Sequence, residues 1–180
     1  MKRHLFLTGP MGCGKSTAIA RAVGTNMKNA GGFLTRRNGT DSLYFTLESP
    51  DGKYKEIFLD FTEGKPRLDL SVFERMGVKL LTGDFLVLDE IGGAELLDSQ
   101  FMAALNRVLH SEIPIIGVLK AEGPASKLMD TLQLSEAYMH ASDALRIRLQ
   151  EDENTLVYDC KQFDEQAGIL AENWVKEFCR

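Results

Sequence analysis

The stretch GPMGCGKST, residues 9–17, is the part of the sequence that indicates the fold most directly. It has the complete spacing of a phosphate-binding loop, with Gly9, four further residues, and then Gly14, Lys15 and Ser16. A short apolar run, residues 4–8, precedes it, and a helix-like segment follows it. A glycine-rich turn between a strand and a helix directs backbone N–H groups and the positive helix end at an anion. The stretch therefore predicts a site for a nucleoside triphosphate.

Each position of this loop has an expected task. The glycines let the backbone approach phosphate oxygens, Lys15 reaches the β and γ phosphates as a catalytic residue, and Ser16 binds Mg²⁺. Thr17 is expected near the α phosphate. Cys13 lies beside a lysine at a helix start, and is compatible with a small space-filling residue or an oxidisable regulatory thiol. The predicted nucleotide-binding residues are Gly9, Pro10, Met11, Gly12, Cys13, Gly14, Lys15, Ser16 and Thr17.

Two acids, Asp89 and Glu90, end the apolar run FLVLDE at residues 85–90. A buried strand that ends in carboxylates supplies the metal anchor that a phosphate loop needs. We expect Asp89 to hold Mg²⁺ together with Ser16, and Glu90 to act as general base toward the attacking water. The overlapping DEIG also fits the Asp-x-x-Gly of GTP-dependent switches, but the chain contains no Asn-Lys-x-Asp guanine reader. A guanine-specific switch is therefore disfavoured.

Apolar strand-like runs alternate with helix-like segments along the chain. The strands are expected at residues 4–9, 84–90, 113–120 and 155–160, and the helices at 16–29, 71–81, 94–110 and 164–178. Glu95 and Asp98 are expected to cap the third helix. This alternation predicts a mainly parallel, three-layer α/β sheet. We expect residues 1–180 to form a single domain.

Two segments depart from the alternation. Residues 32–61 contain β-rich runs separated by RNGTD (37–41) and SPDGK (49–53), which predicts a small antiparallel β insert with hairpin turns. Residues 121–150 are polar and mixed, and are expected to form short helices that act as a mobile cover.

The composition excludes several classes of protein. The net charge is −5 without a long basic run, so nucleic acid is an unlikely partner. Three cysteines without a CxxC pair indicate neither a disulfide framework nor zinc, and His4, His110 and His140 share no metal-ligand spacing. The longest strongly apolar stretch, residues 113–119, is too short to cross a membrane. We therefore expect a cytoplasmic protein.

The motifs resemble those of the small P-loop nucleoside-triphosphatases first described as cancer-related nucleoside-triphosphatases. The resemblance rests on GPMGCGKST, on GGFLT after the first helix, and on FLVLDEIGGAELLDSQF, and it is most secure over residues 3–36 and 84–120. It implies a RecA-like α/β sheet. It also implies slow, Mg²⁺-dependent hydrolysis of several nucleoside triphosphates to diphosphates, with limited base preference.

The chain also differs from that family. Family members commonly have Lys-Met where this chain has Gly93 and Ala94, which removes a positive charge expected near the γ phosphate. Acidic residues often follow GFLT in the family, whereas Arg36 and Arg37 follow it here. Near the C-terminus, KQFDEQ (161–166) lacks the arginine that family members often have after the last strand. Three cations are candidates to replace the missing charge: Lys120 at a strand end, and Arg146 and Arg148, which alternate in ALRIRL as if on one side of an extended segment.

Three functions remain open at this point. A nucleoside-triphosphate hydrolase is the first. A P-loop kinase of a nucleotide or small molecule is the second, and it would use residues 32–61 and 121–150 to bind an acceptor and exclude water. A nucleotide-dependent regulatory module, with slow hydrolysis as a timer and a protein partner as its output, is the third. Release of phosphate without an added acceptor favours the first over the second. Tight nucleotide binding with negligible turnover, together with a partner that depends on the nucleotide, would favour the third.

Overall fold

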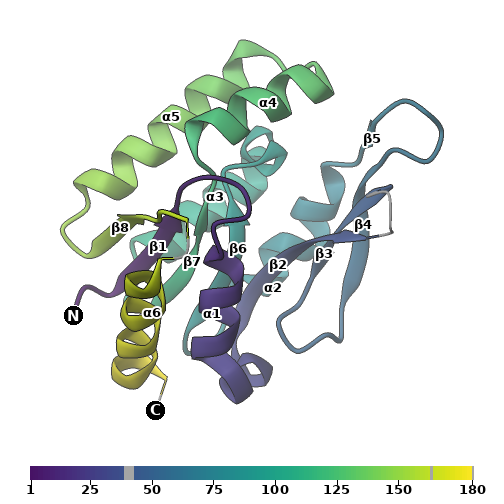
Figure 1. Ribbon diagram of the computed structural model, residues 1–180. Helices are drawn as coiled ribbons and strands as arrows, with labels where there is room; N and C mark the ends of the chain where they lie inside the picture. Colours follow the sequence, from purple (N-terminus) through teal and green to yellow (C-terminus); the bar gives the residue numbers. More distant parts are fainter. Residues whose placement is uncertain (39–42, 163, 180) are drawn as a thin grey trace.

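The described residues form one eight-stranded sheet with helices on both faces (Figure 1). The computed structural model describes residues 1–38, 43–162 and 164–179. The strands are β1 (His4–Thr8), β2 (Gly31–Asn38), β3 (Tyr44–Glu48), β4 (Lys55–Asp60), β5 (Arg67–Leu68), β6 (Leu86–Ile91), β7 (Ile115–Leu119) and β8 (Thr155–Asp159). The helices are α1 (Lys15–Val23), α2 (Val78–Leu80), α3 (Ser99–Leu109), α4 (Glu122–Leu132), α5 (Glu136–Glu151) and α6 (Glu165–Phe178), with the helical turns η1 (Gly24–Asn29), η2 (Phe73–Gly77) and η3 (Ala94–Leu97).

The order of the strands across the sheet is β5-β4-β3-β2-β6-β7-β1-β8. The five neighbouring strands β2, β6, β7, β1 and β8 pair in parallel with one another. Parallel strands end at the same edge of a sheet, so the segments that follow β1, β6 and β7 lie near one another. The predicted α/β fold is confirmed. This edge carries the glycine-rich loop after β1 and the two acids at the end of β6.

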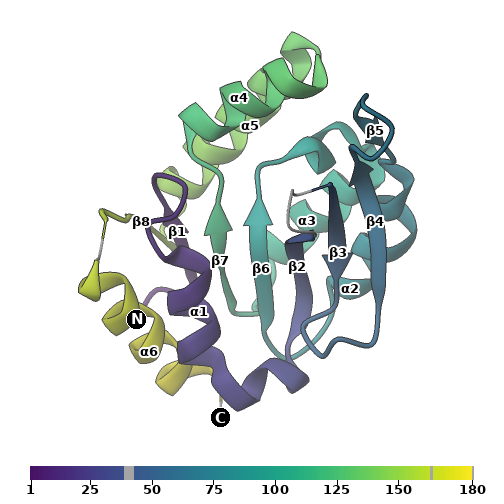
Figure 2. The same cartoon turned by 45° about the vertical axis from the view of Figure 1, so that its right-hand side comes forward.

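Side chains of the parallel strands point alternately to the two faces of the sheet. Along β1, Leu5 and Leu7 belong to the apolar cluster under α1 and α6, whereas Phe6 belongs to the cluster under α3 and α5. Figure 2 shows the sheet between these layers of helices. Burial on both faces explains why β1, β6 and β7 have nearly continuous apolar sequences.

The predicted boundary of the antiparallel insert is wrong at its start. The first half of β2, Gly31–Leu34, pairs in parallel with β6, and only its second half pairs antiparallel with β3. Glycine is needed for the parallel pairing, because a Cβ on Gly32 would lie 2.1 Å from the carbonyl oxygen of Val87. The antiparallel part therefore consists of β3, β4 and β5, joined to the second half of β2.

A row of aromatic rings connects this antiparallel part to the core. The ring of Phe58 on β4 lies 5.0 Å from Phe73, which lies 5.6 Å from Phe101 on α3, and Phe101 lies 5.7 Å from Phe33 on β2. All three pairs have the edge-to-face geometry that aromatic pairs prefer. The antiparallel strands are thus packed on the same core as the parallel sheet.

Residues 121–150 form α4 and α5, so the prediction of helices here is confirmed, although α5 is not short. Tyr138, Leu145 and Leu149 of α5 are buried in the core, and movement of this segment stays a prediction. The expected turn at 49–53 lies between β3 and β4. The expected turn at 37–41 falls partly on residues 39–42, outside the described residues. None of the described helices is long and apolar enough to cross a membrane.

Candidate active site

The glycine-rich loop, residues 9–14, connects the end of β1 to the start of α1. Gly9, Gly12 and Gly14 have φ angles of 126°, 79° and 97°, which residues with a Cβ rarely adopt. At Gly9 space is a second constraint, because a Cβ there would lie 2.5 Å from the carbonyl oxygen of Cys160. The backbone path of the loop therefore requires glycine at these three positions.

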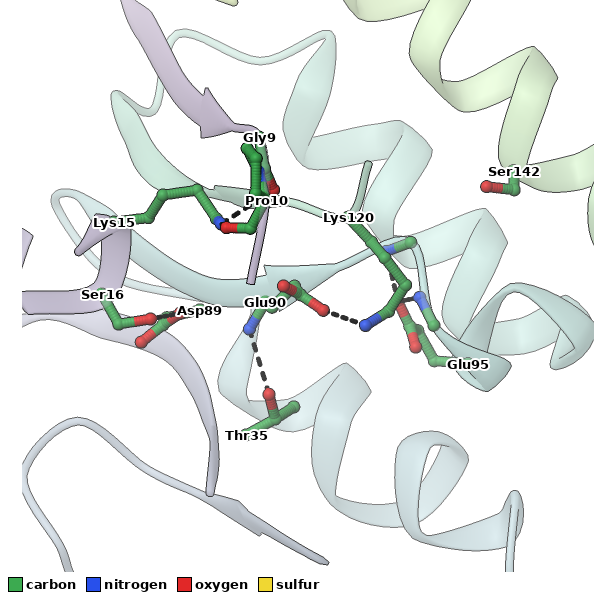
Figure 3. A network of polar contacts seen from close by, with 12 residues as sticks. Gly9, Pro10, Lys15, Ser16, Thr35, Asp89, Glu90, Glu95, Lys120 and Ser142 are labelled. Atoms are coloured by element: carbon green, nitrogen blue, oxygen red, sulfur yellow. Dashed lines mark hydrogen bonds and ion pairs between the residues drawn. The ribbon is translucent and has the colours of Figure 1, made fainter. Parts of the chain in front are cut away.

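Lys15 begins α1 and folds back over the loop that precedes it (Figure 3). Its ammonium group donates hydrogen bonds to the carbonyl oxygens of Gly9, at 3.0 Å, and Pro10, at 2.7 Å. The side chain is buried, so the positive charge is held inside the curve of the loop. A pocket of about 290 Å³ opens beside it and extends to Glu90 and Lys120.

Ser16 on α1 and Asp89 on β6 are in direct contact. The Ser16 hydroxyl donates to Oδ1 of Asp89 at 2.8 Å, and the Arg36 guanidinium donates to Oδ2 at 3.0 Å. Asp89 is buried; its burial raises the pKa of the carboxyl group, and the bonds from Ser16 and Arg36 act in the opposite direction. The structure thus brings together the two predicted metal ligands, and adds Arg36 beside them.

Glu90 and Lys120 form an ion pair at the ends of neighbouring strands (Figure 3). The backbone N–H of Glu90 donates to the Thr35 hydroxyl at 3.2 Å, so β2 also supports this position. Both side chains are only partly exposed and line the pocket at the glycine-rich loop. The predicted general base is therefore in contact with Lys120, one of the three candidate cations.

Glu95 does not cap α3 as predicted, whereas Asp98 does. Asp98 caps α3 by accepting a hydrogen bond from the backbone N–H of Phe101 at 2.7 Å. Glu95 instead turns back: its Oε1 accepts from the N–H groups of Gly92, at 2.7 Å, and Gly93, at 2.9 Å. The side chain is fully buried, which raises the pKa of its carboxyl group, while those backbone bonds oppose the shift.

The turn after Glu90 is held by hydrogen bonds from several elements. Lys120 donates its backbone N–H to the carbonyl of Ile91 at 2.8 Å, and the hydroxyl of Tyr138 on α5 donates to the carbonyl of Gly92 at 2.9 Å. Together with the bonds from Glu95, these contacts fix the backbone on both sides of Gly92. The carboxylate of Glu90 therefore projects from a segment with little freedom to move.

Comparison with known proteins places this chain in a family. The family model described as NTPase matches residues 4–142, which include the glycine-rich loop and both acids. The chain belongs to the NTPase family. This confirms the resemblance inferred from the motifs.

Two curated relatives each match 64% of this NTPase. Nucleoside-triphosphatase THEP1 of Thermotoga petrophila is 30% identical over 128 residues, which is 64% of this chain and 71% of that protein. The cancer-related nucleoside-triphosphatase of Homo sapiens is 32% identical over 143 residues, 64% of this chain and 74% of that protein.

Solved structures of two such proteins share the fold of this NTPase. The crystal structure of THEP1 from Aquifex aeolicus has a TM-score of 0.65 at 16% identity, over 98% of this chain and 99% of the other. The solution structure of a human cancer-related nucleoside triphosphatase has a TM-score of 0.66 at 23% identity, over 97% and 96%. At these identities the likeness concerns the fold alone.

The prediction that Arg146 and Arg148 face one side of an extended segment is wrong, because both lie on α5 of the NTPase. Residues two apart in a helix point in nearly opposite directions. Arg146 donates to Ser142 and pairs with Asp143 on its own helix, whereas Arg148 donates to Asn106 on α3. Neither arginine lines the pocket at the glycine-rich loop.

Sequence reasoning missed four residues that support the site: Thr35, Arg36, Glu95 and Tyr138. A usable signal existed for Glu95 alone, since an acid shortly after two glycines can accept their N–H groups. In the sequence, Arg36 stands out only as a departure from the family pattern. Cys13 is buried in the apolar cluster under α1 and α6, and its Sγ accepts a hydrogen bond from the Lys15 ammonium at 3.4 Å. The two roles expected for this residue stay predictions.

Proposed function

We propose that this protein hydrolyses nucleoside triphosphates to nucleoside diphosphates and phosphate, with Mg²⁺ as cofactor. One observation carries the proposal: a single pocket joins the glycine-rich loop and Lys15 to the carboxylate of Glu90, and Asp89 is bonded to Ser16 beside it. Membership of the NTPase family supports the same enzyme class, since its relatives are named nucleoside-triphosphatases.

Lys15 and the loop are the proposed phosphate-binding groups. The ammonium of Lys15 is bonded to carbonyl oxygens of the loop, which are weaker partners than phosphate oxygens for a cation. A bound triphosphate would offer its β and γ oxygens to Lys15 and its remaining oxygens to the loop amides. Ser16 and Thr17 would lie at the same end of α1, where the helix dipole favours negative charge.

The oxygen atoms of Ser16 and Asp89 fit a magnesium ion. Hydroxyl and carboxylate oxygens are hard ligands, and these two lie 2.8 Å apart. The described residues contain no group of three or more His, Cys, Asp and Glu that could hold a metal ion alone. Mg²⁺ is commonly held by one or two protein oxygens together with substrate phosphates and water. When bound, it would neutralise charge on the β and γ phosphates.

Glu90 is the proposed general base. A water molecule beside its carboxylate would attack the γ phosphorus and give a proton to Glu90. The bond from that phosphorus to the bridging oxygen would then break, and the oxygen would leave on the diphosphate. Lys120, which pairs with Glu90, would gain a second anionic partner in the γ phosphate.

The test is a product assay on the purified protein with Mg²⁺ and each of the four common nucleoside triphosphates in turn, without an acceptor. Equal amounts of diphosphate and phosphate are expected, and Lys15→Ala is the control for contaminating activity. Diphosphate that appears only when an acceptor is added would identify a kinase. Tight binding without any product would identify a regulatory module.

A further inference from the structure

A second pocket lies between the antiparallel strands and α4, and we call it the α4 pocket. Phe45, Leu59 and Phe61 form its wall on the strand side, and Lys127 and Leu128 form its wall on the helix side. Its volume is about 440 Å³, which falls in the range of small-molecule sites, roughly 300–1,000 Å³. The walls are mainly apolar, as in most such sites.

The α4 pocket adjoins the pocket at the glycine-rich loop. Met11, Lys120 and Pro124 line both of them. Lys120 also lines a smaller space of about 110 Å³, which is bounded by Glu90 and Gly93. A molecule in the α4 pocket would therefore lie next to the Lys120–Glu90 ion pair, on the side where the γ phosphate is proposed to bind.

The charge of the α4 pocket is opposite to that of the whole chain. Arg37, Lys120 and Lys127 line it and no described carboxylate does, although the net charge of the protein is −5. Lys120 is paired with Glu90, but neither Arg37 nor Lys127 forms an ion pair with any described residue. Among the described residues, these two cations therefore have no anionic partner, and both could bind an anionic ligand.

We propose that the α4 pocket binds a small organic anion with a flat aromatic body, alongside the nucleotide. The rings of Phe45 and Phe61, 6.3 Å apart and inclined at 60°, supply an aromatic wall for the body of the ligand. Arg37 and Lys127 supply partners for its charged group. An inorganic anion would use only the cations, and a neutral aromatic molecule only the wall. The position beside the γ phosphate rests on the proposed function, whereas the binding itself does not.

The test uses 1-naphthyl phosphate as the probe, titrated calorimetrically. The first titration uses the Lys15→Ala variant, in which binding of the probe to the glycine-rich loop is weakened. The second uses the wild-type protein saturated with Mg²⁺ and a non-hydrolysable nucleoside triphosphate. Saturable binding is expected in both. Inorganic phosphate carries only the charged group, and 1-naphthol carries only the aromatic body. Each is expected to bind at least about tenfold more weakly than 1-naphthyl phosphate.

Charge variants locate the probe. Arg37→Ala and Lys127→Ala, made in the Lys15→Ala background, are each expected to weaken binding about threefold, the usual effect of one exposed charge. Lys28→Ala is the matched control, because Lys28 is also an exposed lysine but lies on η1, outside the pocket. Made in the same Lys15→Ala background, Lys28→Ala should bind the probe as tightly as the Lys15→Ala parent does.

Three results would overturn the proposal. The first is no saturable binding to the Lys15→Ala variant. The second is loss of binding when nucleotide occupies the loop, which would make the α4 pocket a part of the nucleotide site. The third is equal binding by the Arg37, Lys127 and Lys28 variants. Absence of nucleotide hydrolysis would refute the proposed function, but would leave the titration of the Lys15→Ala variant unchanged.

Discussion

Replacing Glu95 separates its two contributions to the site. Oε1 of Glu95 accepts both backbone N–H groups, from Gly92 and Gly93, at 2.7 and 2.9 Å. Glu95→Gln keeps a carbonyl oxygen that can accept both bonds and removes only the negative charge. Glu95→Ala removes the acceptor and leaves two buried donors unsatisfied. The expected cost of the alanine variant is about 2–6 kcal/mol of unfolding free energy, from about 1–3 kcal/mol per unsatisfied donor.

The same change should lower turnover through Glu90. Without Glu95, the N–H groups of Gly92 and Gly93 lose their acceptor, and the turn that carries Glu90 keeps the bonds from Lys120, from Tyr138 and to Thr35. A misplacement of about 1 Å can reduce a rate by about 10²-fold. We expect Glu95→Ala to lower kcat by about that factor while KM changes little, because Glu95 does not line the pocket at the glycine-rich loop. Glu95→Gln should retain most of the stability and most of kcat.

Urea unfolding followed by far-UV circular dichroism gives the stability, and phosphate release gives kcat and KM. If Glu95→Ala lost less than about 1 kcal/mol of unfolding free energy, the contribution assigned to the two backbone hydrogen bonds would be refuted. If Glu95→Gln were as damaging as Glu95→Ala, the charge of Glu95 would matter rather than its hydrogen bonds. Normal kcat in a destabilised alanine variant would show that the turn does not position Glu90.

Three further predictions concern other parts of the molecule. Lys15→Ala should abolish turnover and weaken triphosphate binding with an unchanged circular dichroism spectrum, and a wild-type rate would contradict the role of the loop. Glu90→Gln should keep its affinity for nucleoside triphosphate and lose about 10²- to 10⁴-fold in turnover. Asp89→Asn should also lose turnover, and extra Mg²⁺ should partly restore it. If a Mg²⁺ titration restored Glu90→Gln and not Asp89→Asn, the two roles would be reversed. Burial lowers the pKa of His4 below its usual 6.5, so the unfolded chain binds a proton at a higher pH than the folded chain does. The free energy of unfolding should therefore fall as the pH decreases through 6.5. Urea unfolding at several pH values should show this fall in the wild type and not in His4→Phe.

The parts of the fold that the sequence predicts are those with local signals. Leu5, Phe6 and Leu7 are buried on both faces of the sheet, and such strands appear directly as apolar runs. The loop is equally local, because its glycines are required by their own φ angles. Fold type and loop position could therefore be predicted without knowledge of any long-range contact.

The parts that the sequence does not predict depend on long-range contacts. The pairing of β2 with β6 through Gly32 involves residues more than fifty positions apart, and two glycines after a helix also fit a simple turn. The alternation in ALRIRL fits a strand as well as a helix; the helix is favoured because Leu145 and Leu149, four apart, are both buried. Thr35 and Tyr138 bind backbone groups far away in the sequence, and such contacts leave no trace in the sequence.

The strand order has a consequence for synthesis of the protein on the ribosome. β1 is the first strand to be made, yet both of its neighbours, β7 and β8, come from residues beyond 110. The antiparallel pairs β2–β3, β3–β4 and β4–β5, by contrast, join strands close in sequence and need short loop closures. β1 must therefore wait without its strand partners until β7 and β8 have been translated. The glycine-rich loop is thus made well before the two strands that enclose its supporting strand.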